Sequence, residues 1–145
     1  MIFRIEIKDK DGIFDAAGHG VLRDIADLGI ASARDVRVVQ AFIIEGDISR
    51  DAAERVAREL LVDGVVQDYR IADKPFNGVF TGRKDAHAIE ITYNPGVMDP
   101  VEASTLKGIR DLGIAGVRSV RTSRQFIIEG RLGEKELEFI KDKAL

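Results

Sequence analysis

A five-residue string that occurs twice decides how this chain can be divided. Phe-Ile-Ile-Glu-Gly stands at residues 42–46 and returns at residues 126–130, 84 positions later. The same offset relates Asp-Leu-Gly-Ile-Ala at 27–31 to the identical string at 111–115, with no gap between the two matches. A repeat of this length indicates two copies of one structural unit. We therefore predict a tandem duplication, with a first copy over residues 1–72, a linker over 73–85 and a second copy over 86–145.

The first copy has the residue pattern of a strand, a helix, a long strand, a second helix and a last strand. Residues 2–8 alternate apolar and charged side chains, which favours a half-buried strand. Apolar residues at helical spacing follow over 15–28. The second helix is expected over 50–61, with Ser49 as its N-cap, and the last strand over 65–71.

The longest β-favouring run of the first copy covers residues 36–45. It contains no Gly, Pro, Asn or Asp, so a hairpin inside it is not expected. Ten extended residues span ~33 Å, which is more than a small sheet needs. We predict a long strand, bent or bulged, that contributes to two sheets, and its counterpart over residues 118–129.

The second copy repeats this order but has no counterpart of the last strand. Its first strand is expected at 86–93, its first helix at 100–112 and its second helix at 134–145. An open sheet edge invites pairing with another chain, so we expect the isolated chain to self-associate. A truncated chain, a strand borrowed from another chain and a degenerate second copy all explain the missing strand, and we favour truncation.

Matched apolar positions in the two copies predict that they pack together. The first helices carry leucine and isoleucine at equivalent points, and we expect a pseudo-twofold axis and one common layered core. These residues are Leu22, Ile25 and Leu28 in the first copy and Leu106, Ile109 and Leu112 in the second. The predicted fold class is α+β, a pseudo-dimer whose antiparallel sheet packs on helices.

Composition excludes several classes of function. The 22 basic and 25 acidic residues give a net charge of −3, so there is no basic surface for nucleic acid or for a membrane. The chain has no cysteine, which excludes disulfides, thiolate zinc sites and a cysteine nucleophile. No apolar run reaches the length of a membrane span. We expect a cytoplasmic protein.

The sequence offers little catalytic chemistry. Gly18-His19-Gly20 lies inside a helical pattern and lacks the later glycine and acid of a dinucleotide-binding motif. His19 and His87 have no serine–acid or metal-ligand context. Because no nucleophile, base and orienting group occur together, we predict no catalytic residue, no metal site and no cofactor bound by this chain.

Arginines recur where the long strands begin. Their guanidinium groups suit carboxylates and phosphates, so they are candidates for contacts with a partner or ligand, although pairing with neighbouring Asp and Glu is the simpler role. The recurring residues are Arg34, Arg37, Arg118, Arg121 and Arg124. We single out Arg37, Arg121 and Arg124 as contact candidates.

Several stretches resemble a known family, the small PurS subunit of phosphoribosylformylglycinamidine (FGAM) synthase. Residues 60–71, Leu-Leu-Val-Asp-Gly-Val-Val-Gln-Asp-Tyr-Arg-Ile, are similar to the end of PurS. Residues 95–100, Pro-Gly-Val-Met-Asp-Pro, are similar to its beginning, together with 112–114 and 119–121. The run at 120–126 also resembles the PurS-like N-terminal region of large synthetase chains. Val39-Gln40 departs from the Gly-Lys found at this point in many relatives.

The resemblance implies a fold and a function. Two PurS-like units, related to the ferredoxin-like fold, would form a covalently linked pseudo-dimer. The complete synthase uses ATP, Mg²⁺ and glutamine-derived ammonia to convert formylglycinamide ribonucleotide into its amidine in purine biosynthesis. PurS carries no known catalytic residue and bridges the synthetase and glutaminase parts, which are thus the expected partners.

A pair of ACT-type regulatory modules is the main alternative. Such modules share the strand–helix order, and residues 9–13 resemble the turn that binds their ligand. This alternative predicts a small effector, such as an amino acid, near Gly12 and Gly96. The unbroken run at 36–45 argues against it, because the module needs a hairpin there. A plain dimerisation module without a ligand is a third possibility.

Overall fold

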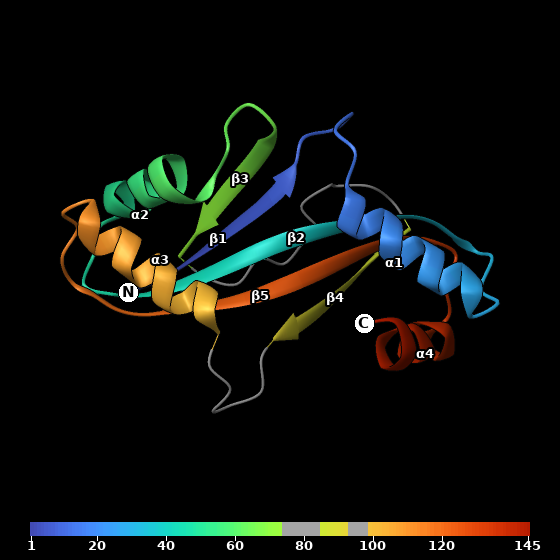
Figure 1. Cartoon of the computed structure of the whole chain (residues 1–145). Helices are drawn as coiled ribbons and strands as arrows, with labels where there is room; N and C mark the ends of the chain where they lie inside the picture. The colour runs from blue at the N-terminus through green and yellow to red at the C-terminus, as the bar shows by residue number, and fades with distance from the viewer. Residues whose placement is uncertain (74–84, 93–98) are drawn as a thin grey trace.

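A single antiparallel sheet of five strands organises the described part of the molecule (Figure 1). The computed structural model describes residues 1–73, 85–92 and 99–145. The strands are β1 (Ile2–Asp9), β2 (Ala33–Gly46), β3 (Gln67–Ala72), β4 (Ala86–Thr92) and β5 (Val117–Gly130), in the sheet order β3-β1-β2-β5-β4. The helices are α1 (Ala16–Asp27), α2 (Arg50–Val56), α3 (Pro100–Asp111) and α4 (Glu134–Ala144), and α2 continues into the π-helical segment η1 (Ala57–Leu61). The predicted α+β class is confirmed. Within the described ranges no helix is long and apolar enough to cross a membrane.

The 84-residue offset holds at the level of whole elements. Adding it to the bounds of α1 and of β2 gives the bounds of α3 and of β5. The same shift carries the start of β1 onto the start of β4, and the start of α2 onto the start of α4. Local signals repeat as well. Asp15 and Asp99 are the N-caps of the first helices, and Gly29 and Gly113 follow these helices with φ of 88° and 81°. The two copies therefore fold alike.

The two long strands pair with each other along their whole length. β2 and β5 run antiparallel. Gln40 pairs with Arg124, and Arg124 is the residue equivalent to Gln40 in the other repeat. A pseudo-twofold axis thus passes through this pair, as the sequence predicts. The predicted contribution of each long strand to two sheets is wrong. Both strands stay in one sheet, where residues 40–45 of β2 pair with β1 on one side and with β5 on the other.

The glycine that ends the repeated string lets the chain cross itself closely. A Cβ atom at Gly46 would overlap the carbonyl oxygen of Gly116, and one at Gly130 would overlap that of Ser32. Both glycines lie at register shifts at the ends of the β2–β5 ladder. Since Gly116 and Ser32 are also equivalent positions, the same close approach occurs twice, and each time only glycine fits.

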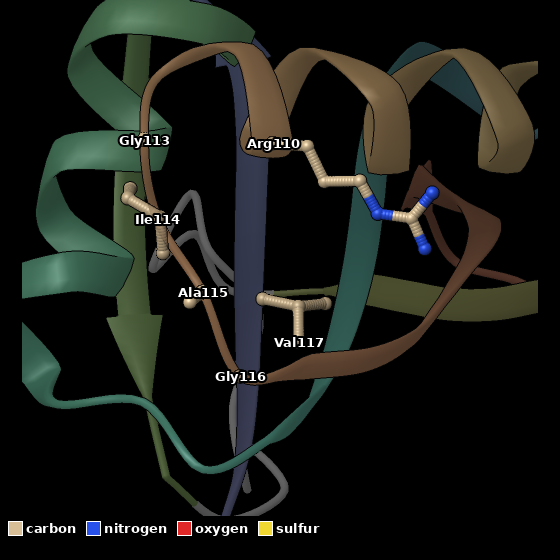
Figure 2. A pocket seen from close by; sticks show the side chains of 6 residues that line it. All are labelled: Arg110, Gly113, Ile114, Ala115, Gly116 and Val117. Carbon is tan, nitrogen blue, oxygen red and sulfur yellow. The ribbon is translucent and has the colours of Figure 1, made fainter.

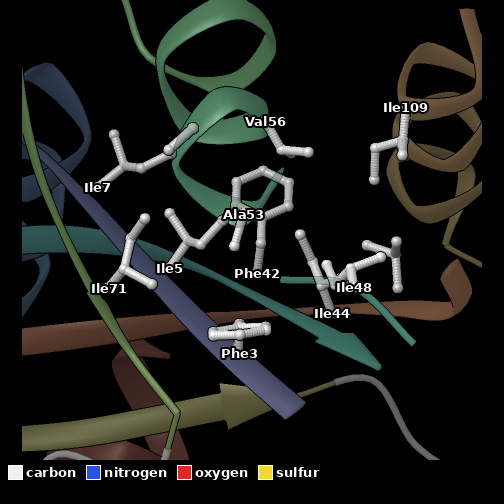
Figure 3. Packing of buried hydrophobic residues seen from close by; sticks show 12 residues of the cluster. Phe3, Ile5, Ile7, Phe42, Ile44, Ile48, Ala53, Val56, Ile71 and Ile109 are labelled. Carbon is white, nitrogen blue, oxygen red and sulfur yellow. The ribbon is translucent and has the colours of Figure 1, made fainter. Parts of the chain in front are cut away.

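The described residues form two core clusters, and each cluster draws on both repeats. The larger one joins β1, β2, α2 and β3 of the first repeat to Ile109 of α3 and Val120 of β5 (Figure 3). The smaller one joins Ile25 of α1 to Ile140 of α4. α1 accordingly lies beside α4, and α3 beside η1. The expected single common core is therefore wrong, because the strongly extended sheet separates the helix pairs at its two ends. Neither repeat buries its apolar face without the other.

The first helices dock differently in the two repeats. Asp15 caps α1 by accepting from the Gly18 N–H at 2.8 Å, and its second oxygen accepts from the Val38 N–H of β2 at 2.9 Å. A Cβ atom at Gly18 would overlap the Val36 carbonyl oxygen, so α1 lies directly against the strand. In the second repeat Glu102 occupies the Gly18 position and accepts from the Thr122 N–H at 3.1 Å. A side chain thus replaces the close backbone approach.

The domain boundaries predicted from the sequence stay predictions. Most of the expected linker, and the turn that contains Gly96, lie outside the described residues. In the first repeat the last strand is β3, which pairs with β1. In the described part of the second repeat no strand has this place beside β4.

We predict opposite effects of one substitution at two glycines of α1. Gly18→Ala should lower the free energy of unfolding by about 1–3 kcal/mol, because the methyl group forces the helix away from β2. Gly20→Ala is the matched control, since a Cβ atom there meets nothing within 4 Å, and it should raise the free energy of unfolding by about 0.5–1 kcal/mol. Urea unfolding of both variants measures the difference. Equal effects would contradict the close docking of α1.

Candidate interaction face

The sheet has one face covered by helices and one that carries most of its charged residues. Pairing fixes the assignment, because side chains opposite each other in register share a face and alternate along each strand. Phe42 and Ile44 point to the helices. We call the other side the polar face. Its principal polar residues are Arg4, Glu6, Lys8, Arg37, Arg70, Glu90, Arg121, Ser123 and Gln125.

A buried carboxylate holds two arginines on the polar face. Glu6 of β1 has a side chain that is 0% exposed. It accepts from the Arg4 Nε at 3.0 Å and from the Arg70 Nε of β3 at 2.6 Å. Because a buried charge is costly unless it is paired, these bonds tie β3 to β1 through side chains as well as backbone.

Arg4 also connects the first repeat to the second. Its guanidinium makes a two-pronged contact with the carboxylate of Glu90 on β4, in which the Nη1–Oε2 distance is 3.2 Å. Glu90 is the repeat counterpart of Glu6, but Ala88 stands where a counterpart of Arg4 would be. One arginine therefore serves both glutamates. Burial lowers the pKa of Arg4, but the hydrogen bonds that Arg4 donates to Glu90 and Glu6 outweigh this effect and leave the pKa above its ordinary value.

Two polar atoms of β5 are buried on this face without a hydrogen-bond partner among the described residues. They are the Ser123 Oγ and the Gln125 Oε1. In register, Ser123 lies opposite Ala41 and Gln125 opposite Glu90. An unpaired buried polar group costs about 1–3 kcal/mol of folding free energy. On this face the hydrogen-bonding groups of the second repeat are therefore less completely paired than those of the first.

The three arginines predicted to make contacts do not form one site. Arg37 and Arg121 are repeat counterparts near opposite ends of the polar face. Arg37 donates to the Ile13 carbonyl oxygen at 3.3 Å and lies 3.7 Å from the Asp35 carboxylate, whereas Arg121 is exposed. Arg124 points to the opposite, helix-covered face.

Arg124 lies in a groove between α1 and α4. The groove has a volume of about 420 Å³ and is lined by apolar residues of both helices together with Gln40 and Arg124. A smaller groove of about 290 Å³ lies between η1 and α3, at the equivalent place of the other helix pair. Among the described lining residues, Arg124 is the charged side chain of the larger groove, and Ser104 and Thr105 are the hydroxyl groups of the smaller one.

A third hollow lies beside the loop from α3 to β5 (Figure 2). It has a volume of about 400 Å³, and Arg110 is its charged side chain, beside glycines and small aliphatic residues from 113 to 117. One arginine among aliphatic groups can attract an anion but supplies no acid–base pair. Gly12, the candidate ligand position of the ACT-type alternative, is exposed with φ of 87° and open space around it.

The two histidines have ordinary surroundings. The exposed His19 ring lies 5.3 Å from the Phe14 ring, and the Nε2 of His87 lies 3.2 Å from the Gly130 carbonyl oxygen. Across the described ranges no group of three acidic or histidine side chains is placed to hold a metal ion.

A family model described as PurS: Phosphoribosylformylglycinamidine (FGAM) synthase matches residues 2–74. Among solved structures, PurS of Methanocaldococcus jannaschii, described as one of the subunits of formylglycinamide ribonucleotide amidotransferase in the purine biosynthetic pathway, is 23% identical. That match covers 49% of this chain and 92% of the other, with a TM-score of 0.46. No curated protein sequence gives a match. The ACT-type alternative finds no support, and β2 is unbroken where it requires a hairpin.

The buried network predicts unequal effects of two equivalent substitutions. Glu6→Gln should lower the free energy of unfolding by about 2–4 kcal/mol, because Arg4 and Arg70 lose the carboxylate that both contact. Glu90→Gln, at the equivalent position of β4, should cost less than about 1 kcal/mol because its side chain is 34% exposed. Chemical denaturation of the two variants gives the comparison. Similar losses would show that the burial of Glu6 does not matter.

Proposed function

Because this chain belongs to the PurS family of phosphoribosylformylglycinamidine (FGAM) synthase, we propose that it is a non-catalytic assembly domain of that synthase. It bridges the synthetase and glutaminase parts of the enzyme in the cytoplasm. The family match over residues 2–74 carries this proposal. The arrangement of the sheet supports it, since two equivalent halves are held as one body by the β2–β5 ladder.

The parts of the synthase have different roles. ATP and Mg²⁺ act in the synthetase part, and ammonia comes from glutamine in the glutaminase part. This chain contributes surfaces of fixed geometry, because its strands and helices hold the charged side chains at set distances. The polar face offers the exposed Arg121, whose guanidinium can meet a carboxylate of a partner subunit in a two-pronged contact.

Activity assays test the bridging role directly. The chain alone should hydrolyse neither glutamine nor ATP. Added to the synthetase and glutaminase parts, it should be required for amidation of formylglycinamide ribonucleotide with glutamine as donor. Amidation with added ammonium salt should depend on it much less, because ammonia in solution bypasses the glutaminase. Equal dependence with both donors would contradict bridging.

A pair of charge reversals on β5 identifies the docking face. Arg121→Glu reverses an exposed charge on the polar face and should weaken capture of the partner subunits by about tenfold, or 1.4 kcal/mol. Arg124→Glu is the matched control, three residues along the same strand but on the helix-covered side. From the sequence alone the two arginines are equivalent contact candidates, whereas the fold places them on opposite faces of the sheet.

A pull-down with each variant gives the ratio of affinities. Thermal unfolding of the two variants alone should show similar midpoints, since both side chains are exposed. Unchanged capture by Arg121→Glu would assign Arg121 to the solvated surface. Loss with Arg124→Glu alone would assign the docking surface to the groove between α1 and α4.

A further inference from the structure

The outer edge of β4 is an open sheet edge in the described part of the chain. β4 ends the sheet order, and its inner side pairs with β5 from Ala86 to Thr92. Its repeat counterpart β1 is an inner strand, because β3 pairs with it over Arg4–Asp9. Figure 1 shows the contrast, with β3 beside β1 at one side of the sheet and β4 at the opposite side. The first repeat thus provides a template for what fits beside the second.

The backbone of β4 is arranged to accept another strand. The Gly130 N–H donates to the Asp85 carbonyl oxygen at 3.0 Å, which makes these two residues a hydrogen-bonded pair. By the alternation of an antiparallel ladder, His87, Ile89 and Ile91 bond to β5. The N–H and C=O groups of Ala88, Glu90 and Thr92 then point to the open edge. In the template, the Lys10 N–H donates to the Val66 carbonyl oxygen at 2.8 Å, in line with β1–β3 pairing.

Apolar surface along β4 is incompletely covered. Ile5 and Ile7 of β1 are 0% and 4% exposed, and they lie opposite Ile71 and Tyr69 of β3. Their counterparts Ile89 and Ile91 are only half-buried. A strand in the place of β3 would remove this remaining apolar area from water, which is favourable by about 25 cal/mol per Å².

Charge defines which strand fits. In the template, Arg70 of β3 lies opposite the buried Glu6 and contacts it at 2.6 Å. Glu90 is the counterpart of Glu6. Its side chain is 34% exposed, and Arg4 contacts both of its carboxylate oxygens. A basic side chain opposite Glu90 would complete the arrangement seen at Glu6, in which one carboxylate contacts two guanidinium groups.

We propose that the outer edge of β4 binds an extended segment of a partner subunit as a sixth, antiparallel strand. Its signature is an apolar, a basic and an apolar residue in succession, opposite Ile91, Glu90 and Ile89. Tyr69, Arg70 and Ile71 show this pattern opposite the template strand β1. The identity of the source as a synthase subunit rests on the proposed function, whereas the signature rests on the internal template alone.

A second copy of the chain fits this edge less well. Pairing β4 with β4 brings together residues whose backbone groups point outward, so Glu90 would face Ala86, Ala88, Thr92 or another Glu90. None of these supplies a cation, and facing glutamates repel. The template thus favours a different chain with a basic residue over self-association through this edge.

A synthetic peptide tests the signature. The probe is the acetylated and amidated octapeptide Val-Val-Gln-Asp-Tyr-Arg-Ile-Ala, which has the sequence of residues 65–72. Titrated into the full chain, it should shift the backbone amide signals of Ala88, Glu90 and Thr92 in a saturable way. The signals of the β1 amides should stay in place, which excludes exchange with the chain's own β3.

Charge reversal gives a matched set of controls. A peptide with glutamate in place of its arginine should bind the unchanged chain about fivefold more weakly, or roughly 1 kcal/mol. Glu90→Lys should reverse this preference, because the lysine then favours the glutamate peptide. Glu90→Lys is a suitable variant since the side chain is partly exposed, and circular dichroism verifies that it folds.

Several outcomes overturn the proposal. They are an absence of saturable shifts up to about 1 mM peptide, a preference that ignores the charge at position 90, and a dimer with β4 amides protected from exchange. The last outcome assigns the edge to a second copy. Because these measurements use the chain alone, they fail independently of the capture and activity assays that test the bridging role.

Discussion

The antiparallel ladder between β2 and β5 is the interaction on which the rest of the structure depends. It is the only described ladder that joins the two repeats, and both hydrophobic clusters form across it. The ladder also explains why α1 lies beside α4 and α3 beside η1. Each long strand ends beside the first helix of the other repeat, so the helix that follows the strand packs there. The glycines at positions 46 and 130 permit the chain to cross where the ladder ends.

Much of this fold could be predicted from the residues because many local signals occur in both repeats. Helix bounds, the N-cap Ser49 and the unbroken long strands follow from local chemistry that needs no knowledge of distant contacts. The single sheet and the two separate clusters could not be predicted. They depend on how strands from different copies pair, and that register is a long-range property which the local pattern does not contain.

The candidate interaction face was the least accessible to sequence reasoning. Arg121 and Arg124 look equivalent as arginines at the start of a long strand, but a spacing of three places them on opposite faces. The network around Glu6 was missed altogether. Its signal was present in the alternation of Arg4, Glu6 and Lys8 along β1, which marks one polar side. The sequence did not show that Arg70 and Glu90, 64 and 86 residues away from Glu6 and Arg4, complete it.

Duplication within one chain frees the residues on the pseudo-twofold axis from symmetry. In a dimer of identical subunits, a residue on the axis faces its own copy, so an arginine there would confront an arginine. Here Gln40 faces Arg124 instead. The same freedom extends to the sheet edges, since one side ends in β3 and the other in β4. An identical pair would present the same strand at both edges of its sheet, whereas the described residues of this chain form the two edges from different strands.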